Sequence, residues 1–174
     1  NNPCVNYDDY RGAVTVLFGL PGMVNIYYGD EVLLAGRIQD MEGCRFPMDW
    51  NRPLSDRQKE VFDLYRALST LKKTSNALQH GGFKVVYAQG SVFVFARFTE
   101  DETLLFCWSA GAEAERVAIE AAEFGLPGKA ITVPVGSGVE VEVDRGADDN
   151  SGVLRLICAP HASAVILLGG VGIA

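Results

Sequence analysis

Residues 92–109 read VFVFARFTEDETLLFCWS, and this stretch decides the fold of the second half of the chain. Residues 92–98 and 103–109 are rich in Val, Phe and Leu, and polar residues lie between them. Two short apolar segments of β-prone residues separated by a turn predict a β-hairpin. The sequence therefore predicts two adjacent antiparallel strands here.

The same pattern of short apolar segments and turns continues on both sides of this hairpin. Turn signals include Gln89-Gly90 and the polar stretch at residues 147–150. About eight short strands are predicted, over residues 83–88, 92–98, 103–109, 116–120, 130–135, 139–143, 153–158 and 163–168. Short strands separated by regular turns are typical of an antiparallel β-sandwich.

The residues before Gly81-Gly82 follow a helical period instead. A helix over residues 57–71, which Ser55 can cap, is predicted by apolar side chains at three- and four-residue steps: Val61, Leu64, Tyr65, Leu68 and Leu71. A second apolar face at helical spacing is predicted from Ala13, Val14, Val16, Leu17 and Leu20, and Pro21-Gly22 ends that helix. The first part of the chain is therefore predicted to be largely helical.

One segment between these helices has a different pattern. Residues 23–28 are continuously apolar except for Asn25, and Gly29 closes the segment. Such a segment fits a strand that is buried on both faces, as in a parallel sheet. A long polar loop follows it, from Asp30 to Pro53.

Composition narrows the classes of partner. The chain has 174 residues, 48% of them hydrophobic, and its 15 basic and 22 acidic residues give a net charge of −7. This composition supports a folded core and excludes a disordered chain. No basic stripe is present to neutralise phosphates, so nucleic acid is not expected as a partner. Apolar stretches fall far short of the ~20 residues that a membrane helix needs, so no membrane partner is expected.

The cysteines and histidines give no metal or cofactor pattern. The four cysteines have no metal-ligand spacing: Cys4, Cys44, Cys107 and Cys158. The last two lie within apolar segments, where cysteine behaves as a small buried hydrophobe. His80 and His161 lie beside a glycine pair and a proline, and both are expected at the surface.

Polar residues that suit a sugar follow the predicted buried strand. Asp30 and Glu31 come directly after it, at the end of a parallel strand where barrel and doubly wound folds bind ligands. The loop beyond carries further candidates: Asp40, Glu42, Arg45, Asp49 and Trp50. Carboxylates and a guanidinium hold sugar hydroxyls, and an indole stacks on the C–H face of the ring. The alternative is that these acids cap local turns or pair with a nearby arginine.

Asp30 and Glu31 are not interpreted as a hydrolytic pair. Adjacent residues on an extended segment point in opposite directions. Glycoside hydrolysis needs two carboxyl groups that face each other across the substrate at ~5–9.5 Å. No catalytic residue is therefore assigned in this segment.

The residues around this loop resemble a known family. Residues 20–31 read LPGMVNIYYGDE and residues 44–50 read CRFPMDW, with Gly36 and Asp40 between them. They closely resemble the end of the catalytic barrel in the alpha-amylase family, glycoside hydrolase family 13. The family pattern is a Pro-Gly-x-Pro-x-Ile-Tyr-Tyr-Gly-Asp/Glu-Glu run, an Asp-containing loop, and Arg-x-Pro-Met-x-Trp. The Cys-Arg before Pro-Met resembles the neopullulanase and cyclomaltodextrinase branch.

The resemblance implies an α+β fold: the last strand and flanking helices of a (β/α)8 barrel, followed by an antiparallel Greek-key β-sandwich. Residues 1–74 would be the end of the catalytic barrel, and residues 75–174 the C-terminal all-β domain. Asp40 and Arg45 match substrate-binding positions of the family. Other residues match its structural motif: Tyr27, Tyr28, Gly29, Asp30, Glu31 and Trp50. Val24 departs from the family pattern, which has proline there.

The resemblance also implies a function for a parent protein: a retaining α-glucan hydrolase that acts on α-1,4-glucosidic links. The family's nucleophilic Asp, acid/base Glu and transition-state-stabilising Asp all lie upstream of Asn1, as do most of its calcium-binding positions. The chain is therefore expected to be an inactive C-terminal fragment without a cofactor of its own, calcium being a cofactor of the parent at most. The alternative is a non-catalytic domain that binds carbohydrate or stabilises the barrel. A transglycosylase fits the same residues.

Self-association is a further expectation. In a whole barrel, residues 23–28 would pair with neighbouring strands and lie under helices. Without those neighbours, the strand edge and the apolar faces of both helices would be uncovered, and an open apolar edge pairs readily with another chain. The first 74 residues are therefore expected either to mediate self-association or to be poorly ordered.

Overall fold

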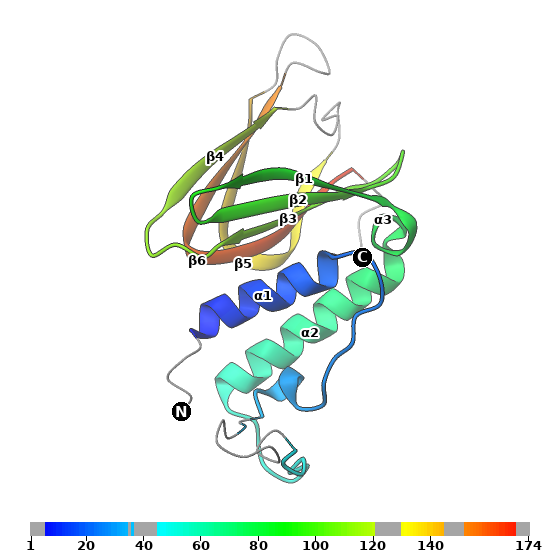
Figure 1. Ribbon diagram of the computed structural model, residues 1–174, viewed down its shortest axis with the longest axis vertical. Coiled ribbons are helices and arrows are strands. Elements are labelled where there is room, and N and C mark those ends of the chain that lie inside the picture. Colours follow the sequence, from blue (N-terminus) through cyan, green and yellow to red (C-terminus); the bar gives the residue numbers. More distant parts are fainter. Residues whose placement is uncertain (1–5, 35, 37–44, 121–129, 145–151, 170–174) are drawn as a thin grey trace.

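The computed structural model describes residues 6–34, 36, 45–120, 130–144 and 152–169, and it confirms the α+β class (Figure 1). Helical elements come first: α1 (Tyr7–Gly19), the 3-10 turn η1 (Asp30–Val32), α2 (Asp56–Thr74) and α3 (Asn76–His80). Six strands follow: β1 (Gly82–Gln89), β2 (Val92–Phe98), β3 (Thr103–Ser109), β4 (Glu115–Glu120), β5 (Ile131–Asp144) and β6 (Val153–Leu168). All their pairings are antiparallel.

The long helices begin where the sequence predicts. Ser55 caps α2, because its side chain accepts from the Gln58 backbone N–H while the Gln58 side chain accepts from the Ser55 backbone N–H. In α1 the Asn6 side chain accepts from the Asp8 N–H, and acidic residues in the first turn complement the helix dipole. Within the part of the chain that the structure describes, no helix is long and apolar enough to cross a membrane.

The eight predicted strand segments form six strands because two strands bend without breaking. Residues 130–135 and 139–143 lie in β5, which bends around residues 136–138, where both glycines have a positive φ. Residues 153–158 and 163–168 lie in β6, which bends near His161 (φ 52°). The two bends lie opposite each other, since Ser137 pairs with Ser163 and Val139 pairs with Cys158. The hydrogen-bond ladder between β5 and β6 therefore continues into both halves.

The paired bends fold the sheet into two layers. Residues 163–168 of β6 pair with β3, which gives an inner layer of β1, β2, β3 and the later half of β6. Residues 153–158 of β6 pair with β4, which gives an outer layer. β5 pairs with both halves of β6 and so belongs to both layers. The last strand thus lies beside β3 although two strands intervene in sequence, which is a non-consecutive connection like those of Greek-key folds.

Alternating side chains of the inner layer fill two separate cores. One side faces the outer layer in an interlayer core: Val92, Val94, Ala96, Leu105, Cys107, Val117, Ile119, Leu154, Leu156, Cys158, Ile166 and Leu168. The other side faces the helices in a helix–sheet core: Val14, Phe18, Val61, Leu64, Tyr65, Leu68, Leu71, Ala77, Leu78, Phe95, Leu104, Phe106, Val135, Val165 and Leu167. Figure 1 shows α1 and α2 side by side below the sheet.

The helices are not left uncovered, contrary to the expectation behind self-association. The apolar face of α2 is buried against α1 and the sheet, and Val14 and Phe18 of α1 are buried as well. The predicted apolar face of α1 is partly wrong, because Leu17 and Leu20, which belong to it, are exposed. A helix satisfies its own backbone hydrogen bonds, so a nearby apolar sheet face is enough to bury its stripe.

The structure contradicts a buried strand over residues 23–28. This segment is irregular, Met23 is fully exposed (100%), and Ile26 (39%), Tyr27 (48%) and Tyr28 (42%) are also open to solvent. A parallel strand needs partners on both sides. All six described strands pair with one another instead, so nothing in the described chain completes the ladder.

A buried arginine joins the helices to the sheet. Arg97 on β2 is 2% exposed, and its guanidinium donates to the carbonyls of Gly19 (3.0 Å), Leu78 (3.3 Å), Gly81 (3.1 Å) and Gly82 (3.0 Å). Burial lowers its pKa. Lys72 Nζ donates to the carbonyls of Phe18 (3.2 Å) and Leu20 (3.1 Å). α1 has no basic residue in its own last turn, so these two cations satisfy the carbonyls at its C-terminus.

A second contact ties α1 to the bend of β6. His161 Nδ1 lies 2.8 Å from Asp9 Oδ1, and the backbone N–H of His161 donates to the Gly111 carbonyl at 3.1 Å. His161, which is expected at the surface, keeps 26% of its side chain exposed and packs its ring partly against α1. His80 is exposed, as predicted.

Candidate functional site

The turn that follows residues 23–28 depends on Gly29. Its φ is 91°, and a Cβ there would lie 2.6 Å from the Leu34 side chain. The Gly29 N–H donates to Glu31 Oε2 at 2.9 Å, and the Asp30 N–H donates to the Tyr27 carbonyl at 3.1 Å. Glu31 is thus held by the backbone of its own turn.

Side chains of α1 and α2 anchor this turn. The Tyr10 hydroxyl donates to the Asp30 carbonyl at 2.9 Å, and Gln58 Nε2 donates to the Val32 carbonyl at 2.7 Å. The Tyr10 and Tyr65 hydroxyls are 3.0 Å apart. Because the single Tyr10 proton goes to Asp30, the Tyr65 hydroxyl donates to Tyr10. Burial raises the pKa of both hydroxyls, so both stay protonated at neutral pH.

The charge on Asp30 is disfavoured in the folded chain. Desolvation raises the pKa of Asp30 above its ordinary 3.8, the Glu31 carboxylate adds to the rise, and a backbone hydrogen bond from Tyr27 opposes it. Glu31 therefore accepts a hydrogen bond within the turn, whereas the ionised form of Asp30 is disfavoured by its surroundings.

Two tyrosines connect this turn to the second half of the loop. The rings of Tyr27 and Tyr28 are 4.9 Å apart and tilted by 44°. The Tyr28 hydroxyl donates to the Phe46 carbonyl at 3.1 Å, so it brings residues 45–46 next to the turn. Arg45 precedes Phe46 directly and is exposed.

The remaining predicted site residues are placed as follows. Trp50 is 84% exposed. Asp49 Oδ1 accepts from the Asn51 N–H at 3.2 Å, which is the local turn role that the alternative reading predicts for such an acid. Asp40 and Glu42 lie outside the described residues. The described chain holds no group of three or more His, Cys, Asp or Glu side chains that could bind a metal ion.

Sequence reasoning missed the anchors of the turn. Tyr10 and Tyr65 are 55 positions apart, and Gln58 and Val32 are 26 apart. Both tyrosines lie on helices and have no local feature that distinguishes them from residues of an apolar face. Only the packing of α1 against α2 brings them to Asp30.

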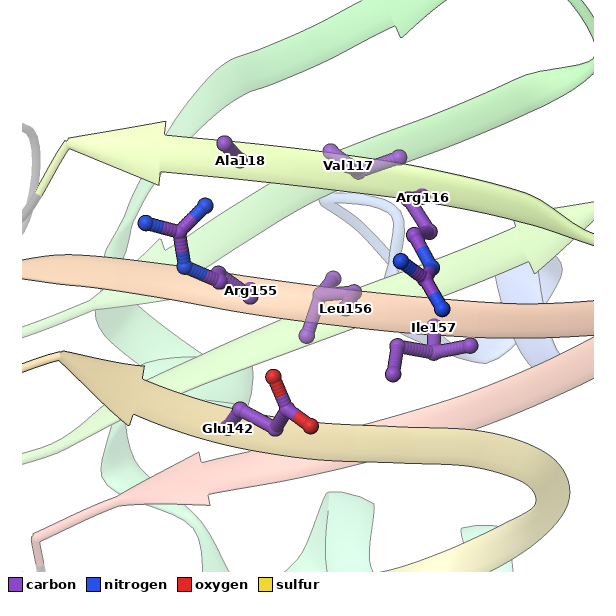
Figure 2. A pocket seen from close by; sticks show the side chains of 7 residues that line it. All are labelled: Arg116, Val117, Ala118, Glu142, Arg155, Leu156 and Ile157. Carbon is purple, nitrogen blue, oxygen red and sulfur yellow. The ribbon is translucent and has the colours of Figure 1, made fainter.

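A second candidate site is a groove on the outer layer, with a volume of about 320 Å³ (Figure 2). Arg116 of β4, Arg155 of β6 and Glu142 of β5 lie along it, and none of the residues that line it is aromatic. The register places Arg155 opposite both Ala118 and Glu142. Arg155 Nη2 also lies 3.5 Å from Asp144 Oδ2. The groove is charged and exposed, and no local pattern in the sequence predicts it.

Comparison with known proteins places these features in a family context. No protein-family model matches the chain. A cyclomaltodextrinase from Thermoanaerobacter pseudethanolicus is 31% identical over 93 residues, which is 53% of this chain and 16% of that protein. Neopullulanase 2 from Thermoactinomyces vulgaris is 27% identical over 122 residues, which is 69% of this chain and 20% of that protein. The chain thus spans about a fifth or less of these relatives.

The fold matches solved structures over nearly its whole length. The debranching enzyme of Nostoc punctiforme aligns with a TM-score of 0.71 and 26% identity, over 95% of this chain and 32% of the enzyme. That enzyme has also been solved after soaking with acarbose. The alpha-amylase of Geobacillus thermoleovorans, complexed with acarbose, aligns with a TM-score of 0.72 over 96% of this chain and 34% of the enzyme. At 21% identity, this second match shows the fold alone.

The chain is therefore related to part of the glycoside hydrolases of the alpha-amylase family, family 13, which confirms the family resemblance. Among its relatives are a cyclomaltodextrinase and a neopullulanase, so the chain is neopullulanase-like, as the Cys44-Arg45 pair predicts.

Proposed function

We propose that the chain is the C-terminal portion of a retaining α-glucan hydrolase that cleaves α-1,4-glucosidic links. Residues 1–74 would end its catalytic (β/α)8 barrel, and residues 75–174 would form its C-terminal domain. The observation that carries this proposal is the alignment of 95% of the chain with 32% of a debranching enzyme. In the parent, residues 23–28 would become a barrel strand once neighbouring strands pair with them.

The substrate-binding part of the proposal rests on Arg45 and Asp40. Arg45 lies beside the carbonyl that accepts from Tyr28, and its guanidinium is open to solvent. A guanidinium and a carboxylate suit the hydroxyls of a glucose unit. Trp50, with 84% of its surface exposed, offers an indole face for stacking on a sugar ring. Acarbose complexes of related enzymes support an α-glucan as the ligand.

The isolated chain is proposed to be inactive. A retaining glycosidase needs a nucleophilic carboxylate and an acid/base carboxyl ~5–5.5 Å apart. Glu31 accepts a hydrogen bond from Gly29 and is engaged in its own turn.

Self-association is proposed through the exposed segment 23–28, which is the apolar surface that the isolated chain would present to a second copy.

Two assays on the full chain test this function. Incubation with maltodextrin or cyclodextrin should release no reducing sugar, and turnover that is lost in Glu31→Ala would contradict the assignment. Calorimetric titration with acarbose should detect binding that Arg45→Ala weakens about tenfold, as for the loss of one charged hydrogen bond. Arg66→Ala is the matched control, because Arg66 is an exposed arginine on α2 that pairs only with Asp63 at 3.6 Å among the described residues.

The alternative is a non-catalytic domain that binds carbohydrate or stabilises the barrel. The observation that favours it is the groove along β4, β5 and β6, which has a volume of about 320 Å³. This groove lies on the side of the sheet away from α1 and α2 (Figure 1). Its lack of an aromatic platform argues against sugar stacking there. If Arg116→Ala abolishes acarbose binding while Arg45→Ala leaves it intact, the groove is the binding site and the alternative replaces the main proposal.

A further inference from the structure

Two buried thiols meet across the interlayer core. Cys107 on β3 and Cys158 on β6 are 0% exposed, and their Sγ atoms are 3.6 Å apart. Cys107 pairs with Ala164 in the inner layer, whereas Cys158 pairs with Glu115 and Val139 in the outer layer. The two side chains therefore point at each other from different layers, and they are 51 positions apart in the sequence.

Each of the two sulfurs has the other as its hydrogen-bonding partner among the described residues. Both belong to the interlayer core, whose other members are aliphatic. To form a disulfide, two sulfurs in van der Waals contact must come to ~2.05 Å from each other. Rotation of the side chains can bring them that close only when the two Cβ atoms already face each other. Immunoglobulin sandwiches place their inter-sheet disulfide in the same way, between facing strands of two layers.

We propose that Cys107 and Cys158 are a latent disulfide site that locks the inner layer to the outer layer when a low-molecular-weight disulfide such as oxidised glutathione oxidises the pair. In the first step, the thiolate of one cysteine attacks a glutathione sulfur, which forms a mixed disulfide and releases one glutathione thiolate. In the second step, the other cysteine attacks the protein sulfur of that mixed disulfide and releases the second glutathione. Two protein thiols are oxidised, one glutathione disulfide is reduced to two thiols, and the two cysteine protons pass to them.

Burial makes this closure slow in the native chain. The hydrogen bond with Cys158, together with burial, raises the pKa of the Cys107 thiol, and the thiolate is the reactive form. The oxidant must also reach the core, which requires β4 to open, since β4 is the edge strand beside Cys158. Once closed, the bridge constrains the unfolded chain and raises stability.

The test uses the full chain with Cys4→Ser and Cys44→Ser, so that Cys107 and Cys158 are its only cysteines. The protein is unfolded in denaturant, refolded in buffers of oxidised and reduced glutathione, and quenched with acid. Intact mass, free thiols measured in denaturant, and peptide mapping report the redox state. During refolding the thiols are open to the oxidant, so slow entry into the core cannot prevent the reaction. A failure to form the disulfide under these conditions would therefore be due to unsuitable geometry. The same background with Cys107→Ala is the control, because it can form only a glutathione adduct.

The expected product is lower in mass by two hydrogens, has no free thiol, and yields one cross-linked peptide that joins Cys107 to Cys158. Its Tm should exceed that of the reduced chain by roughly 5–10 °C. The Cys107→Ala control should show no such rise. Refolded protein that keeps both thiols, carries only glutathione adducts, or melts at a lower temperature when bridged would overturn the proposal.

Discussion

α1 (Tyr7–Gly19) and residues 23–28 are close neighbours in sequence, yet only α1 forms regular secondary structure and buries apolar side chains. α1 is formed and packs Phe18 into the helix–sheet core at 2% exposure, whereas Ile26 is 39% exposed in an irregular segment. Both segments are apolar enough to be buried. The difference is that a helix closes its hydrogen bonds within itself, while a strand depends on neighbours. Apolar sequence alone therefore does not make a strand.

Hydrogen exchange should show this contrast most strongly. Amides of β2 and β3 lie in central strands with buried side chains, while residues 25–28 have no ladder. We expect protection factors in the two strands to exceed those of residues 25–28 by about three orders of magnitude. Exchange is followed by mass spectrometry on the native chain. Comparable protection of both regions would mean that residues 25–28 are paired in solution.

Truncation of one side chain from each segment gives the next largest effect. Phe18→Ala removes a buried ring that packs edge-on against Tyr65, with centroids 5.8 Å apart, and should lower the free energy of unfolding by about 3–5 kcal/mol. Ile26→Ala should change it by less than about 0.5 kcal/mol. Urea denaturation followed by circular dichroism measures both. Equal losses would show that residues 23–28 contribute to the core.

Arg97 tests how firmly the helices are joined to the sheet. Arg97→Ala leaves the four carbonyls at the end of α1 and between α3 and β1 without the guanidinium donor, so we expect the free energy of unfolding to fall by about 3 kcal/mol. Arg97→Lys restores a charge with fewer donors and should recover part of that loss. Arg66→Ala, which changes an exposed arginine, is the control. A loss for Arg97→Ala no larger than that of the control would exclude the proposed role of the guanidinium in joining these elements.

The smallest expected effect concerns the turn after residues 23–28. Desolvation and Glu31 raise the pKa of Asp30, so the folded chain holds a proton on Asp30 at a pH where the unfolded chain has lost it, and stability falls as pH rises through that range. Asp30→Asn should therefore stabilise the chain at pH ~7 by a few tenths of a kcal/mol, because solvent screens this partly exposed group.

The gain from Asp30→Asn should disappear as pH drops below the ordinary carboxyl value of 3.8, where Asp30 is neutral in both states. Thermal melts between acid and neutral pH measure it. Asp101→Asn, in the exposed turn between β2 and β3, is the matched control. A stabilisation that persists in acid would show that charge is not its cause.

Patterns within short stretches of sequence predict the elements whose stabilising contacts lie close together in the chain. Strands β2 and β3 have the predicted bounds, and α2 contains the predicted residues 57–71. The hairpin and the amphipathic helix are visible within a short window because their partners are close in sequence. The sequence predicts breaks where β5 and β6 bend, because residues 136–138 and His161 resemble turn residues unless the partner strand is known.

Contacts between distant residues were beyond such patterns. Arg97 lies in an apolar strand and reaches the carbonyl of Gly19, 78 positions away. Tyr10, Tyr65 and Gln58 hold the turn that carries the candidate site, and nothing in their local sequence indicates it. The resemblance of residues 20–50 to a known family pattern supplied the candidate site, and the physics of a single sequence does not contain that information.

The shared strands have a mechanical consequence. β5 and β6 each run through both layers, so neither layer has a complete set of hydrogen bonds without the other. Separating the two layers would have to detach these two strands from their partners in one layer, because both strands continue through the bends. The β-rich part of the chain should therefore melt in one cooperative event, with no intermediate in which a single layer survives.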